Sequence, residues 1–262
     1  MILRSKFLLQ NTIQYPQYLT FVKQCKKMKK FLQILSIALL LAACHESDTY
    51  QLPPAEPLDS RYFPLDEGAW RDFQVTEITI DEPIALFDTV QYIVREQFGG
   101  IFIDNFGDTL RQIERFRRTT EGDKWQRMNT WLAYVNGTEV IQIEENTRYV
   151  KMQLPLSVGK TWNGNAYNMT DTLQKYQYCV DSIDCQMVIG SFSFDSVLTI
   201  SQKKELTAIS KILVAERYAV GVGMVERVAI DIYSDSYAPD IDIENRVTQG
   251  TMVYQTLLNY GK

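Results

Sequence analysis

Apolar residues alternate with polar ones along most of the chain after residue 60, as expected of β-strands with one buried face. Val90, Tyr92 and Val94, for example, lie at alternate positions. The same pattern predicts further strands over 111–119, 125–135, 140–144, 149–154, 174–180, 192–201, 213–219, 224–233 and 251–260. A short helix fits best at 201–210. The sequence therefore predicts an all-β protein with little helix.

Two local features refine this picture. Phe73 and Val75 share one strand face while Ile78 and Ile80 share the other, so we expect a β-bulge between the two pairs, near residues 76–77. Asn136-Gly137 predicts a tight hairpin, because both residues tolerate positive φ.

The chain contains a short internal sequence repeat, which we call the echo, with copies that start near residues 63 and 154. Residues 63–70 and 154–162 both read apolar-Pro-Leu-x-x-Gly followed by Trp. Each copy suits the opening of a β-meander, because proline fixes a strand entry and glycine allows a tight turn. A pair of ligand-binding edges is the less favoured interpretation. The predicted architecture for 61–262 is a single antiparallel, strongly curved sheet or half-barrel, with a two-sheet β-sandwich as the alternative.

The first 43 residues have the pattern of a sorting signal. A basic stretch, Met28-Lys29-Lys30, precedes an apolar run over 31–41 that is too short to span a bilayer. The run ends in Leu41-Ala42-Ala43-Cys44, which resembles the lipobox of bacterial lipoproteins. We expect residues 1–43 to be removed, with Met28 as the true start, and Cys44 to carry diacylglycerol. The alternative is an ordinary signal peptide or a short membrane anchor with a chance cysteine, and residues 1–27 could alternatively form a genuine long leader. Residues 44–60, with three prolines, suit a flexible tether.

This sorting signal predicts an outer-membrane lipoprotein at the periplasmic face or the cell surface. The first 43 residues contain seven of the 27 basic residues and no acidic ones, so the remaining 219 residues have a net charge of −12. An acidic domain is a poor partner for nucleic acid or anionic head groups. We therefore expect no nucleic-acid partner and attachment to the membrane through the lipid alone.

Cysteine and histidine usage limits the chemistry. Cys179 and Cys185 remain after cleavage, and in an oxidising compartment they form either a disulfide closing a hairpin end or two free thiols. The only histidine is His45, in the tether. A histidine-dependent triad or metal site is thus excluded from the folded domain. The sequence nominates no catalytic residue and no cofactor.

The acidic residues leave two functions possible, carboxylate-based hydrolysis and calcium binding. A hydrolase using two carboxylates is possible, although no pair is recognisable. Asp240, Asp242 and Glu244 alternate and could surround a calcium ion, but the spacing lacks the glycine of an EF-hand loop. We favour solvated side chains and predict no metal site.

Several longer motifs resemble uncharacterised secreted lipoproteins of Bacteroidetes. They are the two echo copies, the second extended by Trp162-Asn-Gly-Asn, together with Phe194-Asp-Ser-Val-Leu and Glu216-Arg-Tyr-Ala-x-Gly-Val-Gly. The resemblance implies a secreted lipoprotein without an assigned activity.

The triplet Asp-Ser/Thr-aliphatic occurs five times, more often than the roughly one copy expected from average composition. It resembles the O-glycosylation site of exported Bacteroidetes proteins. Alternatively, it reflects the turn-then-strand preference of these residues. The predicted acceptors are Thr89, Thr109, Thr172, Ser182 and Ser196.

Trp125 and Trp131 share a strand face by their even spacing, and such a face could hold an apolar chain or a sugar. Core packing is the favoured interpretation.

The leading functional hypothesis is a non-enzymatic envelope lipoprotein that binds an apolar or glycan ligand or a protein partner. The alternatives are a structural accessory subunit of a surface complex and a carboxylate-based hydrolase.

Overall fold

The computed structural model describes residues 60–105, 107–169 and 177–262. Contacts divide the chain into a unit over 1–54 and a second over 55–262, and every described residue lies in the second. The predicted leader, the lipidation site Cys44, the tether up to residue 59 and the predicted glycan acceptor Thr172 lie outside the described residues. Within the described part of the chain, no helix is long and apolar enough to cross a membrane.

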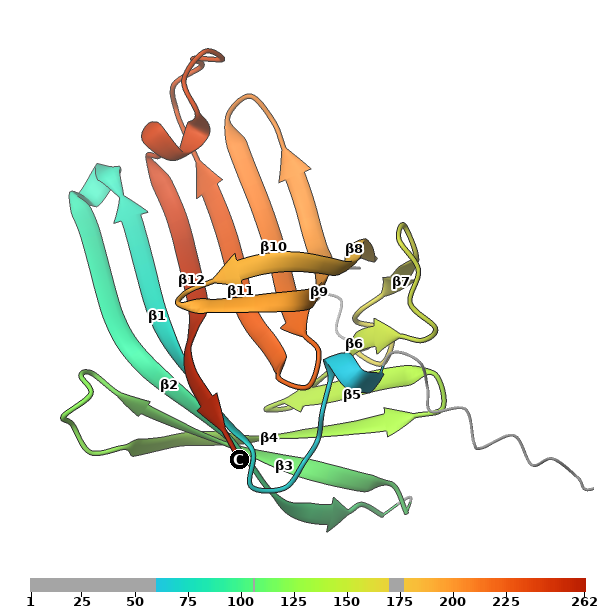
Figure 1. Ribbon diagram of the computed structural model, residues 1–262. Coiled ribbons are helices and arrows are strands. Elements are labelled where there is room, and N and C mark those ends of the chain that lie inside the picture. The colour runs from blue at the N-terminus through green and yellow to red at the C-terminus, as the bar shows by residue number, and fades with distance from the viewer. Residues whose placement is uncertain (1–59, 106, 170–176) are drawn as a thin grey trace, which may run out of the picture. The chain divides into compact units, whose positions relative to one another are not determined.

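Twelve antiparallel strands form a single, nearly closed, barrel-like sheet (Figure 1). The strands are β1 (Trp70–Asp81), β2 (Leu86–Ile103), β3 (Thr109–Arg118), β4 (Gln126–Asn136), β5 (Glu139–Glu144), β6 (Thr147–Gln153), β7 (Thr161–Asn163), β8 (Gln177–Ile189), β9 (Phe192–Leu206), β10 (Ser210–Ala219), β11 (Gly223–Tyr233) and β12 (Gln249–Gly261). The described helices are three 3-10 turns: η1 (Ser60–Tyr62), η2 (Glu82–Ile84) and η3 (Ile243–Asn245). The predicted all-β class and the single curved sheet are confirmed, and the sandwich alternative is not adopted.

The sheet consists of two six-stranded meanders placed side by side. Its order is β6-β5-β4-β3-β2-β1-β12-β11-β10-β9-β8-β7, so the first meander runs β1 to β6 and the second β7 to β12. β1 and β12 join the two meanders in the middle of the sheet. The two outermost strands, β6 and β7, are the edges that a closed barrel would have to bring together.

The internal echo lies at the entry to each meander, with the same backbone geometry in both copies. Gly68 and Gly159 adopt φ of 83° and 81°, a region that favours glycine. The N–H of Gly68 donates to the carbonyl of Phe98, and that of Gly159 donates to Val180, both at 2.8 Å. Each turn therefore attaches to the second strand of its own meander, β2 or β8.

Hydrogen bonds across the seam between β6 and β7 bring the two sheet edges together. The Val150 N–H donates to the carbonyl of Gly164 at 2.9 Å, and the indole N–H of Trp162 donates to the carbonyl of Val150 at 2.8 Å. The Asn168 side chain accepts from the N–H of Arg148 and donates to its carbonyl. These bonds satisfy edge groups that would otherwise be left unpaired.

The largest core fills the interior of this sheet, between the two meanders. It includes Trp131, Val150, Trp162, Tyr178 and Tyr218, all buried. The β8–β9 hairpin folds across the front of the sheet in Figure 1 and closes a second core. Its tip lies against β12, because a Cβ atom at Gly190 would meet the Leu257 carbonyl at 2.8 Å. Only a glycine permits this approach.

Two local predictions are wrong. Residues 201–206 continue β9 rather than forming a helix, since they pair with β10 through Leu206. The bulge of β1 lies between Asp72 and Phe73, not near 76–77. β1 needs no bulge at 76–77 because both of its faces are covered. Phe73 and Val75 pack in the core under the hairpin, while Ile78 and Ile80 pack on the opposite face beneath η3.

Candidate functional site

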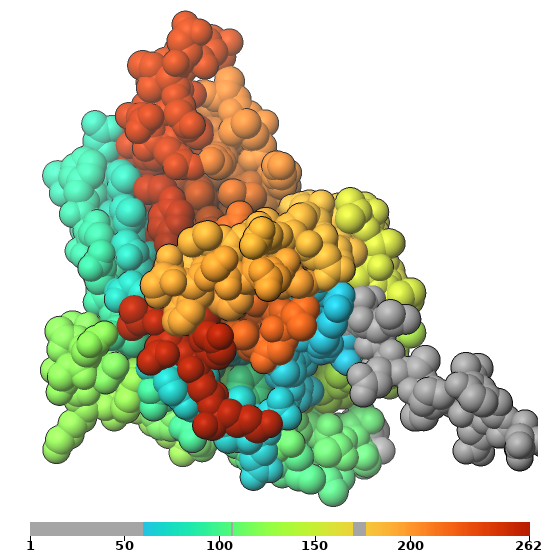
Figure 2. Space-filling model, in the orientation of Figure 1, coloured from blue at the N-terminus to red at the C-terminus, as the bar shows by residue number. Residues whose placement is uncertain are grey.

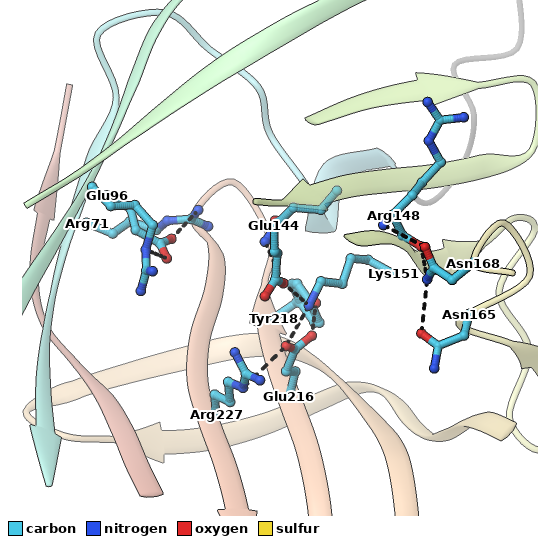
Figure 3. Close-up of polar contacts among 12 residues, drawn as sticks. Arg71, Glu96, Glu144, Arg148, Lys151, Asn165, Asn168, Glu216, Tyr218 and Arg227 are labelled. Atoms are coloured by element: carbon cyan, nitrogen blue, oxygen red, sulfur yellow. Dashed lines mark hydrogen bonds and ion pairs between the residues drawn. The ribbon is translucent and has the colours of Figure 1, made fainter. Parts of the chain in front are cut away.

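A largely buried group of charged side chains lies inside the sheet, between β5–β6 of the first meander and β10–β11 of the second (Figure 3). Lys151 Nζ lies 2.8 Å from a carboxylate oxygen of Glu144 and 2.9 Å from one of Glu216. The Tyr218 hydroxyl donates to Glu216 at 2.5 Å, and Arg227 Nε lies 3.9 Å from the same carboxylate. We call these five residues the Lys151 cluster.

The pKa shifts of the two carboxylates and the two cations of the Lys151 cluster favour their charged forms, while burial raises the pKa of Tyr218 and keeps its hydroxyl neutral. Burial would raise the pKa of Glu216, but Lys151 and Arg227 outweigh it and lower that pKa to about 2. The pKa of Glu144 is lowered because the nearby Lys151 overcomes burial in the same way. Burial opposes the charge on Lys151, yet the two carboxylates raise its pKa. The cluster is therefore a fixed, neutralised ion network.

This geometry argues against acid–base chemistry in the Lys151 cluster. A glycoside hydrolase needs one carboxylic acid whose pKa is raised so that it can donate a proton. The pKa values of Glu144 and Glu216 are instead both lowered, and both carboxylates bind the ammonium group of Lys151. The cluster connects the two meanders across the barrel interior rather than presenting a proton donor.

A second buried group contains more positive than negative charge. Arg71 Nη2 lies 3.1 Å from Glu96, and Arg115 Nε lies 3.4 Å from the other oxygen of the same carboxylate. Two guanidinium groups therefore share one carboxylate. The Arg71 guanidinium also lies 4.7 Å from the Phe98 ring centroid and donates to the Val222 carbonyl.

A polar cleft opens at the end of the β3–β4 hairpin, which projects at the lower left of the molecule, in light green, in Figure 2. Its volume is about 510 Å³. The residues that line it are Arg117, Arg118, Thr119, Asp123, Lys124 and Gln126. We call it the β3–β4 cleft. The three cationic side chains of the cleft contrast with the negative net charge of the whole chain.

Stacking contacts orient the two arginines of the β3–β4 cleft. The Arg117 guanidinium lies 3.8 Å from the Tyr92 ring centroid, and that of Arg118 lies 4.2 Å from Trp125. Asp123, the one carboxylate of the cleft, accepts from the backbone and the hydroxyl of Thr120. Nε of Arg118 is buried without a hydrogen-bond partner among the described residues.

The predicted ligand face of Trp125 and Trp131 is divided by the structure. Trp131 is only 7% exposed and packs in the interior core, while Trp125 lies outside with Arg95 and Arg118 against its ring. The even spacing fails because β4 contains an extra residue. Its Thr130 pairs with Glu114 while Arg127 pairs with Phe116. One extra residue turns the following side chains to the opposite face.

The disulfide between Cys179 and Cys185 is absent, and both thiols are free. The two residues lie within one strand, β8, not at a hairpin end. Cys179 pairs with Ser201 and Cys185 with Val197, four positions apart on β9, which separates the cysteines by about 13 Å. A disulfide requires Cα atoms within about 7 Å of each other.

Four predicted glycan acceptors lie among the described residues. Thr89 and Thr109 are exposed, on β2 and at the start of β3. Ser182 and Ser196 are half-buried, on β8 and β9. The Ser196 hydroxyl already contacts the Tyr62 hydroxyl at 2.8 Å and donates to Asp184. Glycosylation at these positions stays a prediction.

Two residues of the acidic triplet in the β11–β12 loop, Asp242 and Glu244, make local contacts. Asp242 accepts from the Glu244 N–H at 3.1 Å, and Glu244 pairs with Lys211. Among the described residues, no group of three or more His, Cys, Asp or Glu side chains could hold a metal ion.

Sequence reasoning missed the Lys151 cluster and the β3–β4 cleft. Lys151 and Glu216 do have a sequence signal, since each is a charged residue within a strand with apolar neighbours, in Tyr-Val-Lys-Met and Val-Ala-Glu-Arg-Tyr. Such residues often mark a buried polar network. The cleft has only a weak signal, the run from Arg115 to Arg118 before a polar turn.

Comparisons with known proteins provide little guidance. No protein-family model matches the chain, and no curated protein matches it. Two solved structures are similar: an inferred exported protein with a YmcC-like fold from Bacteroides fragilis, with TM-score 0.34, and an inferred lipoprotein from Parabacteroides distasonis, with TM-score 0.32. Each is 11% identical, and each alignment covers 76% of this chain and 98% of the other. Similarity this low carries neither fold nor function over to this chain.

Proposed function

We propose that this chain is a lipid-anchored envelope protein whose folded part is a non-catalytic binding module for an anionic glycan. The observation that carries the proposal is the β3–β4 cleft, with three cationic side chains around about 510 Å³ on an acidic protein. A volume of this size suits a ligand of a few sugar rings. The anchor is the predicted lipid on Cys44.

The arrangement of the cations favours an acidic glycan over a neutral one. Arg117 and Arg118 are stacked on aromatic rings, so their guanidinium groups are oriented before a ligand arrives. Guanidinium groups bind carboxylate and sulfate through paired, charge-assisted hydrogen bonds. The lining residues Thr119 and Gln126 provide hydrogen-bonding groups for sugar hydroxyls.

Binding is tested with the full chain in detergent by isothermal titration calorimetry, using oligogalacturonate as the anionic glycan and an uncharged dextran oligosaccharide as its control. We expect saturable binding of the oligogalacturonate alone, weakening as salt rises. The double variant R117Q/K124Q should bind at least about tenfold more weakly, the scale of a lost charge-assisted hydrogen bond.

The matched control is R127Q, which removes a positive charge from the same hairpin but outside the cleft lining. Its affinity should equal that of the unmodified chain. Equal binding of the two glycans, or unchanged affinity in R117Q/K124Q, would overturn the proposal.

A second candidate, an accessory subunit of a surface complex, has one supporting observation. Ile84 and Phe87 protrude from the β1–β2 turn, 69% and 66% exposed. Exposed apolar groups of this kind often mark a protein contact. Crosslinking from a photoreactive residue at position 87 in cells would give a single protein adduct if this candidate is right, and none if it is wrong.

A further inference from the structure

A small cavity lies where the first echo copy meets the end of β12. Its volume is about 230 Å³. The residues that line it are Pro64, Asp66, Ala69, Trp70, Arg71, Phe98, Gly221, Val222, Tyr260, Gly261 and Lys262. We call it the Arg71 cavity. It shares no lining residue with the β3–β4 cleft.

The lining of the Arg71 cavity is apolar apart from one buried cation and one ion pair. Ala69, Phe98 and Val222 contribute apolar walls. Asp66 and Lys262 pair with each other at 3.2 Å, and both are exposed, so their charges are matched in solvent. Arg71 is only 4% exposed.

Among the described residues, the two guanidinium groups of Arg71 and Arg115 pair with only one carboxylate. Arg71 pairs with Glu96 (Figure 3). Arg115 pairs with the same carboxylate, which leaves one positive charge in excess within this group. Nε of Arg71 has no hydrogen-bond partner among the described residues, although the atom is buried. An uncompensated buried charge is costly, so a bound anion would stabilise this arrangement.

Two glycines create the space that the Arg71 cavity and its walls occupy. At Gly223, where φ is 91°, a Cβ atom would overlap Nη1 of Arg71. At Gly261 a Cβ atom would come within 2.9 Å of the Trp70 ring. The chain thus leaves room for an arginine and an indole around the cavity, as a formed binding site requires.

We infer that the Arg71 cavity binds a small carboxylate with an apolar body, whose carboxylate pairs with the Arg71 guanidinium and whose body contacts Phe98 and Val222. The volume is below the range of about 300–1,000 Å³ found for drug-sized ligands, which limits the ligand to about one ring or a short alkyl chain. Arg71 already donates to Glu96 and to the Val222 carbonyl, so the ligand carboxylate would accept from the remaining guanidinium hydrogens. This site is independent of the glycan-binding proposal.

The test uses fluorine NMR on the full chain in detergent, with 4-fluorobenzoate as the probe and 4-fluorobenzamide as its neutral isostere. We expect a saturable change in the benzoate signal and at least about tenfold weaker binding of the amide. Detergent micelles without protein provide the background. Absence of a saturable signal, or equal affinity for both probes, would show that the inference is wrong.

Three variants locate the binding. R71M removes the charge at similar length, and V222F narrows the cavity while retaining Arg71; each should weaken benzoate binding at least about tenfold. R95M is the matched control, because Arg95 stacks on Trp70 without lining the cavity. If R71M does not fold, V222F decides the question. Unchanged affinity in a folded R71M or V222F, or equal loss in R95M, would overturn the assignment.

Discussion

The indole N–H of Trp162 donates a 2.8 Å hydrogen bond to the backbone carbonyl of Val150, across the seam between the end of the first meander and the start of the second. Both residues are buried in the interior core. The corresponding tryptophan of the first echo copy, Trp70, is half-buried instead, stacks on Arg95 and lines the Arg71 cavity. The two copies thus have the same turn geometry but different surroundings.

The seam gives the first prediction. Trp162→Phe removes the hydrogen-bond donor and leaves the buried Val150 carbonyl without this partner, which should lower the free energy of unfolding by about 1–3 kcal/mol. Urea denaturation followed by circular dichroism measures it. Trp70→Phe is the control and should have a smaller effect. Equal effects would mean that the bond does not stabilise the seam.

Removing the central cation of the Lys151 cluster should be more costly. Lys151→Met leaves Glu144 and Glu216 buried without their shared partner, and we expect a loss of roughly 3–5 kcal/mol in the free energy of unfolding. Arg127→Met is the control, since Arg127 pairs with Glu114 on the surface and should change stability by no more than about 1 kcal/mol. A loss in Lys151→Met as small as in the control would argue against the network.

The lowered pKa of Glu216 predicts how stability depends on pH. Its carboxylate has a pKa of about 2 in the folded chain, below its ordinary value of 4.5, so the unfolded chain binds the proton first as pH falls. The stabilising contribution is full above pH 4.5 and is lost as pH falls towards 2. Chemical denaturation at several pH values measures this slope.

Glu216→Gln provides the comparison for that measurement. The variant should be less stable at neutral pH, because Lys151 loses one of its two carboxylates. It should also lose less stability than the unmodified chain between pH 4.5 and 2, since the titrating group is gone. Parallel pH profiles for the two proteins would contradict the lowered pKa.

The two cysteines of β8 give a covalent prediction. Because Cys179 and Cys185 lie about 13 Å apart along the strand, both should remain thiols after export. Alkylation under denaturing, non-reducing conditions followed by peptide mass spectrometry should label both positions fully. A peptide pair that is labelled only after reduction would show that the disulfide forms.

The predicted lipid anchor on Cys44 is tested by mass spectrometry of protein extracted from membranes. We expect a mature N-terminus at Cys44 with the added mass of diacylglycerol, and Cys44→Ala should release the protein from the membrane fraction. Sugar masses on peptides with Thr89 or Thr109 would support glycosylation. A chain that still begins at Met1 or Met28 without lipid would contradict the predicted compartment.

Much of the fold could be predicted because strand periodicity is local. Alternation located most strands, and the echo at 63 and 154 located the entry to each meander. Alternation also misled where the chain inserts one residue. The even spacing of Trp125 and Trp131 predicts a shared face, but the extra residue of β4 between Arg127 and Thr130 separates them.

The sequence by itself determined the all-β class, the acidic character and the lack of histidine chemistry in the folded part, since composition and two-residue periodicity do not depend on distant contacts. Only the tertiary structure decided which charges are buried and which residues meet. Lys151 and Glu216 are 65 residues apart, and no local rule links them. Their contact arises because the curved sheet brings β6 and β10 together across its interior, where low polarity makes each unpaired charge costly.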